Sequence, residues 1–151
     1  MKPTIMEKDE LILIGFKRKY LVTDDTHTLI PQLWDEYLER QNEINHWIKE
    51  VSAGICFDGN EQGFSYFVGG FVTDIEDIPN GMEVLKLPPQ KYAIFTFKGG
   101  ADKIGDHWEY INDVWEKQTD CVRTGVDFEY YDSRFHPDSD ESELDIYISI
   151  K

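Results

Sequence analysis

The chain has few cysteines and no long apolar run. Its two cysteines, Cys56 and Cys121, lie far apart and belong to no CxxC motif or histidine cluster, which argues against a disulfide framework and against a metal site. The N-terminus has no apolar stretch of signal-peptide length, and no later segment approaches the ~20 apolar residues of a membrane span. We therefore expect a cytoplasmic protein with no cofactor, no metal and no membrane segment.

Basic residues are also scarce. Lysine and arginine number 15 against 30 aspartates and glutamates, which gives a net charge of −15. This charge repels phosphate backbones, so we expect no direct binding to nucleic acid. It favours a cationic ligand or a basic protein surface as partner. A well-hydrated surface without any such partner explains the charge equally well, because net charge governs solubility first.

The composition indicates one packed domain over residues 1–151. Hydrophobic residues make up 40% and aromatic residues 14% of the chain. A chain of this length can bury roughly two-thirds of the surface that it exposes when unfolded. The core should therefore be rich in aromatic rings.

The order of predicted elements repeats. Residues 10–20 are strand-like, residues 29–51 have apolar residues close to helical spacing, and residues 54–58 and 64–73 read as a hairpin. Residues 91–98 are again strand-like and precede an amphipathic helix over 104–116, and strands follow over 126–131 and 144–150. The acidic loop between these last strands contains no glycine, unlike a calcium loop.

This order predicts an α+β fold of two βαββ repeats, at about residues 8–75 and 88–151. The two antiparallel sheets can join, with each helix covering the outer face by its apolar stripe. The opposite face of the joined sheet is then expected to curve around a central ligand cleft between the repeats.

An acidic residue lies among rings in the segment Phe128-Glu129-Tyr130-Tyr131. A carboxylate removed from water stays ionised only if a cation, a hydrogen-bond donor or trapped water compensates it. An acid lined by rings therefore suggests a receptor for cations. Alternatively, every second residue of a strand can face solvent, which would make Glu129 an ordinary surface residue.

Three segments carry a resemblance to a known family. They are Leu87–Gly99, with a proline-containing turn before Tyr-Ala-Ile-Phe, then Phe128–Asp132, and the terminal Asp145–Lys151. In this order and spacing the chain resembles the GyrI-like small-molecule-binding superfamily, the effector-binding domains of bacterial transcription activators. The resemblance implies two βαββ repeats about a pseudo-twofold axis, with a ligand cleft between them. It also matches Glu129 to the family's cleft carboxylate, which faces lipophilic cations in drug-sensing members.

With Glu129 in a cleft, strand parity places Tyr131 on the same side, and we expect Tyr147 to line that face from the neighbouring strand. Rings there would offer contact area and cation–π attraction to a bound cation.

The remaining wall candidates come from elements whose facing is less defined. Trp34, Tyr37 and Trp108 lie on the predicted helices, where the same spacing also suits core residues. Phe57 and Phe71 come from the first hairpin, in which Gly69-Gly70 can form a bulge that inverts the facing of the strand.

Three functions are compatible with these residues. The first is a stand-alone module that binds amphipathic cationic molecules, with a role in drug sensing or transcription regulation. The second is a small-molecule hydrolase with Glu129 as general base and Tyr131 or Tyr147 orienting water. The third is an acidic protein that occupies a basic site, such as one on gyrase. Regulators of the family carry a helix-turn-helix before this domain, whereas here the domain begins almost at residue 1, so we expect a regulator as partner rather than direct DNA binding.

Overall fold

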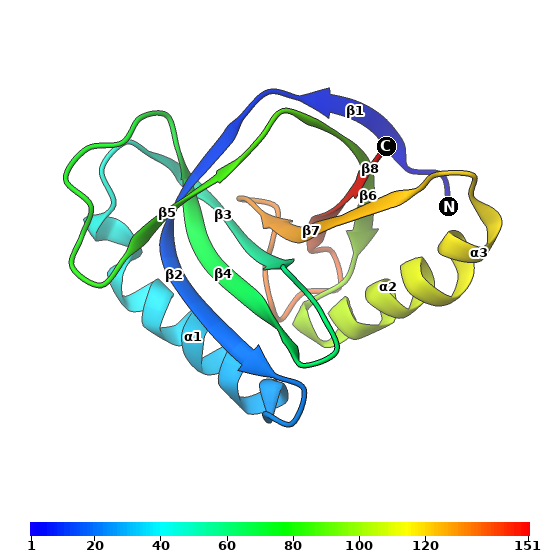
Figure 1. Ribbon diagram of the computed structural model, residues 1–151, viewed down its shortest axis with the longest axis horizontal. Coiled ribbons are helices and arrows are strands. Elements are labelled where there is room, and N and C mark those ends of the chain that lie inside the picture. The colour runs from blue at the N-terminus through cyan, green and yellow to red at the C-terminus, as the bar shows by residue number, and fades with distance from the viewer.

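A curved antiparallel sheet of eight strands forms the frame of the molecule in the computed structural model, which describes all residues from 1 to 151 (Figure 1). The strands are β1 (Thr4–Lys8), β2 (Leu11–Leu21), β3 (Trp47–Phe57), β4 (Gly63–Val72), β5 (Glu83–Leu87), β6 (Gln90–Lys98), β7 (Arg123–Tyr131) and β8 (Glu143–Ile150).

Two helical segments accompany the sheet. The first is α1 (Thr26–Arg40), which ends in a 3-10 turn over Gln41–Glu43. The second runs without interruption through a 3-10 turn (Ala101–Lys103), α2 (Ile104–Tyr110), a π-helical stretch (Ile111–Trp115) and α3 (Glu116–Gln118). No helix combines the length and apolarity needed to cross a bilayer.

The strand order β1-β6-β8-β7-β3-β4-β2-β5 reads as two matching halves that meet at β7 and β3. One half contains β2, α1, β3 and β4, and the other contains β6, α2, β7 and β8. Each half is completed by a strand from the other repeat, because β1 pairs with β6 and β5 pairs with β2. The predicted α+β fold of two βαββ repeats is confirmed, and the exchanged edge strands β1 and β5 interlock the repeats.

The first helix is shorter than its predicted range of 29–51. It ends at Arg40, and the chain turns at His46, whose φ is 59°, before it enters β3 at Trp47. The apolar spacing of Trp47 and Ile48 fits a helix, but Trp47 pairs with Val72 of β4. From Ser52 onward β3 pairs with β4 on one edge and with β7 on the other, and this pairing fixes the segment as a strand.

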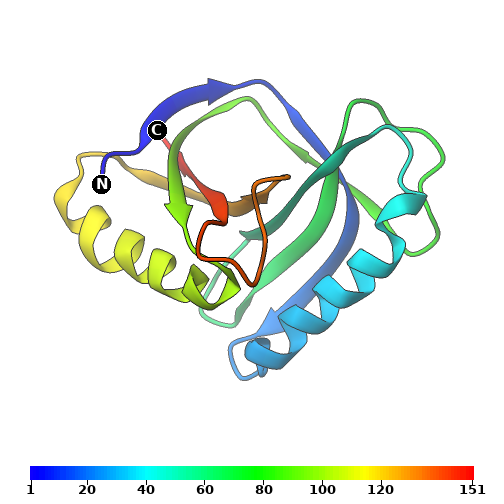
Figure 2. The same ribbon diagram turned by 180° about the vertical axis from the view of Figure 1, so that it is seen from behind.

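Both helical segments pack on the same side of the sheet (Figures 1 and 2). Leu33 and Tyr37 of α1 are buried in one cluster with strands β2 and β4, and Ile111 and Trp115 are buried in another with β6 and β8. Each large apolar side chain buried in this way contributes about 1.5–3 kcal/mol. These clusters fix the helices over the two halves and leave the central strands β3 and β7 between them.

The opposite face of the sheet is filled by a third cluster. We name it the ring cluster; its buried members are Leu13, Ala53, Ile55, Phe67, Phe71, Leu87, Tyr92, Ile94, Phe128 and Tyr147. Neighbouring rings are stacked, tilted or edge-to-face, with centroids 4.5 to 6.2 Å apart. This face was expected to curve around the ligand cleft. It holds a small pocket of about 160 Å³. The larger cavities described below lie on the side that carries the helices.

Candidate functional site

Glu129 lies at the centre of the sheet, on the side that carries the helices. Its cross-strand partner is Gly54 of β3. The indole Nε1–H of Trp108 donates to Glu129 Oε2 at 2.7 Å, and the hydroxyl of Tyr131 donates to Oε1 at 2.5 Å. No lysine, arginine or histidine forms an ion pair with this carboxylate. Its charge is stabilised by two hydrogen bonds and is left without a counter-ion.

Burial sets the proton affinity of this group. Desolvation raises the pKa of Glu129, and the hydrogen bonds from Tyr131 and Trp108 oppose that rise because they favour the ionised form. The pKa of Tyr131 is raised well above its usual value, first by burial and then by the negative charge of Glu129. Tyr131 therefore keeps its proton at neutral pH and donates it in the hydrogen bond to the carboxylate.

Alternation along β7 explains the facing of these residues. Phe128 is fully buried in the ring cluster on one face. Glu129 and Tyr131 share the other face, as their mutual hydrogen bond requires.

Gly54 makes room beside the carboxylate. A Cβ at this position would lie 2.2 Å from Tyr66 Oη and 3.0 Å from Trp34 Cζ2. The phenol of Tyr66 occupies that space and accepts a hydrogen bond from Trp34 Nε1 at 3.1 Å. Trp34 and Trp108 therefore both reach from a helix to the sheet. Trp34 donates its indole N–H to Tyr66 of β4, and Trp108 donates its indole N–H to Glu129 of β7.

A cavity of about 530 Å³ adjoins the carboxylate, and we name it the Glu129 cleft. Residues of both helical segments and of three strands line it. They are Ile30, Trp34, Gly54, Cys56, Tyr66, Ala101, Ile104, Trp108, Asp127, Glu129 and Tyr131.

Four of the predicted site residues meet in this cleft: Glu129, Tyr131, Trp108 and Trp34. Tyr66 and Gly54 were not predicted from the sequence. The signal available for Gly54 was its position inside a strand, where glycine often marks the close approach of another group. No local pattern distinguishes Tyr66 from the other rings of β4.

Tyr147 does not lie in the cleft, so the expectation that it shares a face with Glu129 is wrong. The register of β7 and β8 places Tyr147 opposite Phe128, whereas the partner of Glu129 is Ile146. Directly paired residues share a face of the sheet. The ring of Tyr147 accordingly stacks on Phe128, with centroids 4.5 Å apart.

Three other candidates also lie outside the cleft. Phe71 belongs to the ring cluster, and Phe57 packs against it. Tyr37 of α1 is fully buried between this helix and the sheet, and its hydroxyl lies 2.6 Å from that of Ser52 in β3. Tyr37 supports the cleft indirectly, because its ring meets the edge of Trp34.

Asp127 brings a second carboxylate to the cleft. Arg123 Nη2 donates to Asp127 Oδ2 at 2.6 Å, so this acid already has a cationic partner. Cys56 also lines the cleft and is exposed at its surface. Partial desolvation by the surrounding walls, followed by the charges of Glu129 and Asp127, raises the pKa of its thiol to about 12. A thiol held in its protonated form is a poor nucleophile. Glu129 is therefore the lining group that is available to pair with a bound cation or to act as a base.

A second cavity of about 640 Å³ lies next to the cleft. The two share Trp34, Ala101, Ile104 and Tyr131 as lining residues. The rings of Trp34 and Tyr131 meet edge-to-face with centroids 5.1 Å apart. This pair therefore stands at the boundary between the two cavities, and we name the larger one the second lobe.

Comparison with known proteins agrees with this architecture. The transcriptional regulator BrlR of Pseudomonas aeruginosa is 36% identical over 154 residues, which cover 99% of this chain and 56% of BrlR. The chain thus spans little more than half of that relative. The putative transcriptional regulator YobU of Bacillus subtilis is 30% identical over 130 residues, which cover 81% of this chain and 79% of YobU.

A solved structure extends the likeness to the fold. SAV2435, in a structure with bound tetraphenylphosphonium, superposes with a TM-score of 0.82 at 20% identity, covering 100% of this chain and 94% of that one. The model of the GyrI-like small molecule binding domain matches residues 1–151. The chain belongs to the GyrI-like small-molecule-binding family.

Proposed function

We propose that the Glu129 cleft binds single lipophilic cations, and that this binding serves drug sensing or transcription regulation. The observation that carries the proposal is a carboxylate without a basic partner on the wall of a ring-lined cavity. A bound cation would supply the missing counter-charge. A neutral molecule of the same shape would leave the carboxylate desolvated and unpaired, which costs free energy.

The cleft walls suit a delocalised charge. Trp34, Trp108, Tyr66 and Tyr131 all border the cavity. A cation over such rings gains about 0.5–2 kcal/mol per favourable contact, and burial of apolar ligand surface contributes roughly 25 cal/mol per Å². The carboxylate then selects for charge and the rings provide affinity.

The relatives support the biological part of the proposal. SAV2435 takes a lipophilic cation on the same fold, and BrlR and YobU are described as transcriptional regulators. We infer that the ligand of this chain is a signal read by a regulatory partner.

Calorimetry with two probes of similar shape tests the proposal. Tetraphenylphosphonium carries a charge, and triphenylphosphine oxide does not. Glu129→Gln should weaken binding of the cation about 10- to 100-fold, as expected for charges roughly 6–12 Å apart at an effective dielectric near 20. Binding of the neutral probe should stay nearly unchanged. Equal losses for both probes would overturn the assignment.

A matched control separates local from general charge effects. Asp9→Asn combined with Glu10→Gln removes two exposed acids that line neither cavity. This variant should retain nearly all of the affinity for tetraphenylphosphonium. A loss as large as that of Glu129→Gln would mean that the net charge, and not the cleft, attracts the cation.

Hydrolysis is the second candidate, favoured by the raised pKa of Glu129 beside an open cavity. A carboxyl tuned in this way is suited to general-base chemistry. Both of its oxygens already accept hydrogen bonds, however, so water would have to displace or share a donor. Glu129-dependent turnover of an epoxide would establish this function in place of simple binding.

A further inference from the structure

We propose that the second lobe is a separate subsite for the second positive charge of elongated dications whose first charge lies at Glu129. The inference rests on the proposed function of the Glu129 cleft. It adds a class of ligand, long molecules with two cationic ends, and a set of residues that the cleft itself does not use.

The two cavities are placed for one ligand to occupy both. They share four lining residues, and the edge-to-face pair Trp34 and Tyr131 stands between them. Along β3, Gly54 lies opposite Glu129 and Glu50 lies four residues earlier, at the second lobe.

The second lobe offers apolar surface to a ligand. Leu38 of α1 lines it and is 51% exposed. Trp47 is fixed by the bond from its Nε1–H to the carbonyl of Val51 at 2.9 Å. Phe135 meets the ring of Tyr131 edge-to-face at 4.7 Å. An apolar spacer or ring in the lobe would remove part of this surface from water.

The charges around the lobe favour a cation. Asp35, Glu50 and Asp132 line it, and no lysine or arginine does. Asp35 and Glu50 take part in no ion pair. Asp132 is compensated by Arg134, so Asp35 and Glu50 are the groups that remain to attract a second charge.

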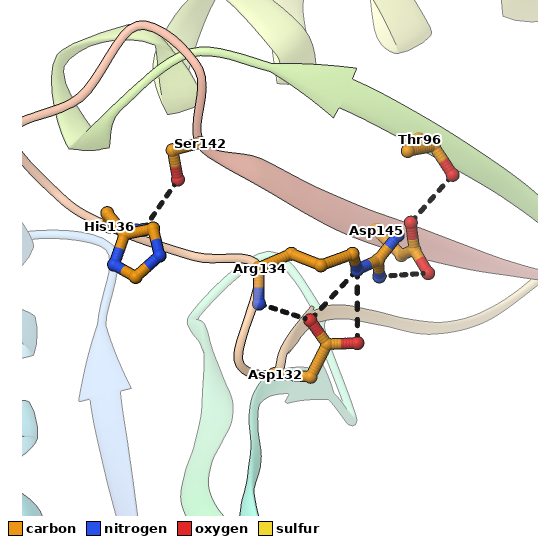
Figure 3. A network of polar contacts seen from close by, with 6 residues as sticks. All are labelled: Thr96, Asp132, Arg134, His136, Ser142 and Asp145. Atoms are coloured by element: carbon orange, nitrogen blue, oxygen red, sulfur yellow. Dashed lines mark hydrogen bonds and ion pairs between the residues drawn. The ribbon is translucent and has the colours of Figure 1, made fainter.

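The loop between β7 and β8 is held in place as a wall of the lobe (Figure 3). Arg134 Nε donates to Asp132 at 2.9 Å, and Arg134 Nη2 donates to Asp145 of β8 at 2.9 Å. Thr96 of β6 donates to the other oxygen of Asp145. These bonds occupy Arg134 and turn its guanidinium toward the sheet.

The far end of this loop is fixed as well. His136 N–H donates to Ser142 Oγ at 2.7 Å (Figure 3), and Ala101 N–H donates to the carbonyl of Pro137 at 2.9 Å. The loop is thereby tied both to itself and to the start of the second helical segment. A wall ordered before binding lowers the entropy that a ligand must overcome.

A series of bis(quinolinium) alkanes tests the inference, each compared with a quinolinium alkane of the same chain length that ends in a hydroxyl. Above a threshold spacer length, the dication should bind about fivefold more tightly than its monocationic match, as expected for contacts with exposed carboxylates. Asp35→Asn combined with Glu50→Gln should remove most of that advantage. The Asp9→Asn, Glu10→Gln variant should preserve it.

The outcomes separate this inference from the function on which it rests. If monocations bind without dependence on Glu129, the proposed function itself fails. If monocations require Glu129 but dications of every length gain nothing, or keep their gain in the Asp35→Asn, Glu50→Gln variant, only the subsite is overturned. Thermal unfolding of each variant verifies that it is folded.

Discussion

The two faces of the central strand pair β3 and β7 contain similar rings but differ in how they are packed. On the face away from the helices, Phe128 and Tyr147 stack at 4.5 Å and belong to the ring cluster. On the helix face, Tyr131, Trp34 and Trp108 stand around a cavity of about 530 Å³. The number of rings therefore does not decide whether a face is filled or open.

Polar groups and a missing side chain explain the difference. Trp108 and Tyr131 are turned so that their N–H and O–H reach Glu129, and Trp34 is turned toward Tyr66. Gly54 leaves the space into which Tyr66 and Trp34 reach. Rings held by hydrogen bonds cannot rotate freely to fill a gap. On the opposite face Tyr92 has such a bond, from Gln90, whereas Phe71, Phe128 and Tyr147 have none and pack against one another.

The largest expected effect tests the filled face. Phe128→Ala should lower the free energy of unfolding by about 3–5 kcal/mol, because a fully buried ring is replaced by a cavity. Urea denaturation measures this change. Tyr131→Phe, which keeps a ring on the open face, should cost far less. A loss below about 1 kcal/mol for Phe128→Ala would contradict the close packing of that face.

Trp108→Phe tests the hydrogen bond to the carboxylate. The lost donor served an ionised acceptor, so the variant should be destabilised by about 1.5–3 kcal/mol, whereas Trp34→Phe removes a bond to a neutral phenol and should cost about 0.5–1.5 kcal/mol. The pH at which cation binding is half lost should rise only in Trp108→Phe, because the ionised form of Glu129 loses a donor. Equal behaviour of the two variants would mean that the charge at Glu129 plays no special part.

Gly54→Ala tests the origin of the open space. The added Cβ would displace Tyr66 and should cost about 1–3 kcal/mol of stability while weakening tetraphenylphosphonium binding. Gly105→Ala is the matched control, since no heavy atom lies within 4 Å of its Cβ position and α2 should gain up to about 1 kcal/mol. Unchanged stability and binding in Gly54→Ala would show that the missing side chain at Gly54 does not create the open space.

The smallest expected effect is a pH dependence with opposite signs for binding and stability. As pH falls through the raised pKa of Glu129, the carboxyl gains a proton and cation affinity should fall. The folded state holds this proton more tightly than the unfolded state, so rising pH should destabilise the wild type relative to Glu129→Gln. The difference should develop above the ordinary carboxyl pKa and level off above the raised one.

Urea titrations of both proteins between about pH 4 and pH 8 measure this stability difference. The control is Asp9→Asn, Glu10→Gln, whose acids are exposed and should give no such trend. A wild-type protein that gains stability over Glu129→Gln with rising pH would show that the carboxylate is better solvated than its position indicates.

The sequence alone determined the features that depend on neighbouring residues. Alternation along β7 separated Phe128 from Glu129 and Tyr131, and helical spacing placed Trp34 and Trp108 on the two helices. The repeated order of strands and helices, together with the family resemblance, established the α+β class. The exchanged strands β1 and β5 were missed because each has only five residues and no alternating apolar pattern.

Only the tertiary structure decided which residues meet at the cleft. The pairing of β7 with β8 shifts between Arg123 and Asp127, and the resulting register puts Tyr147 opposite Phe128 and away from Glu129. The cleft lies between the helices because their own clusters fix them apart over the outer strands. Register and helix position depend on contacts between segments far apart in the chain, and no local pattern of residues records them.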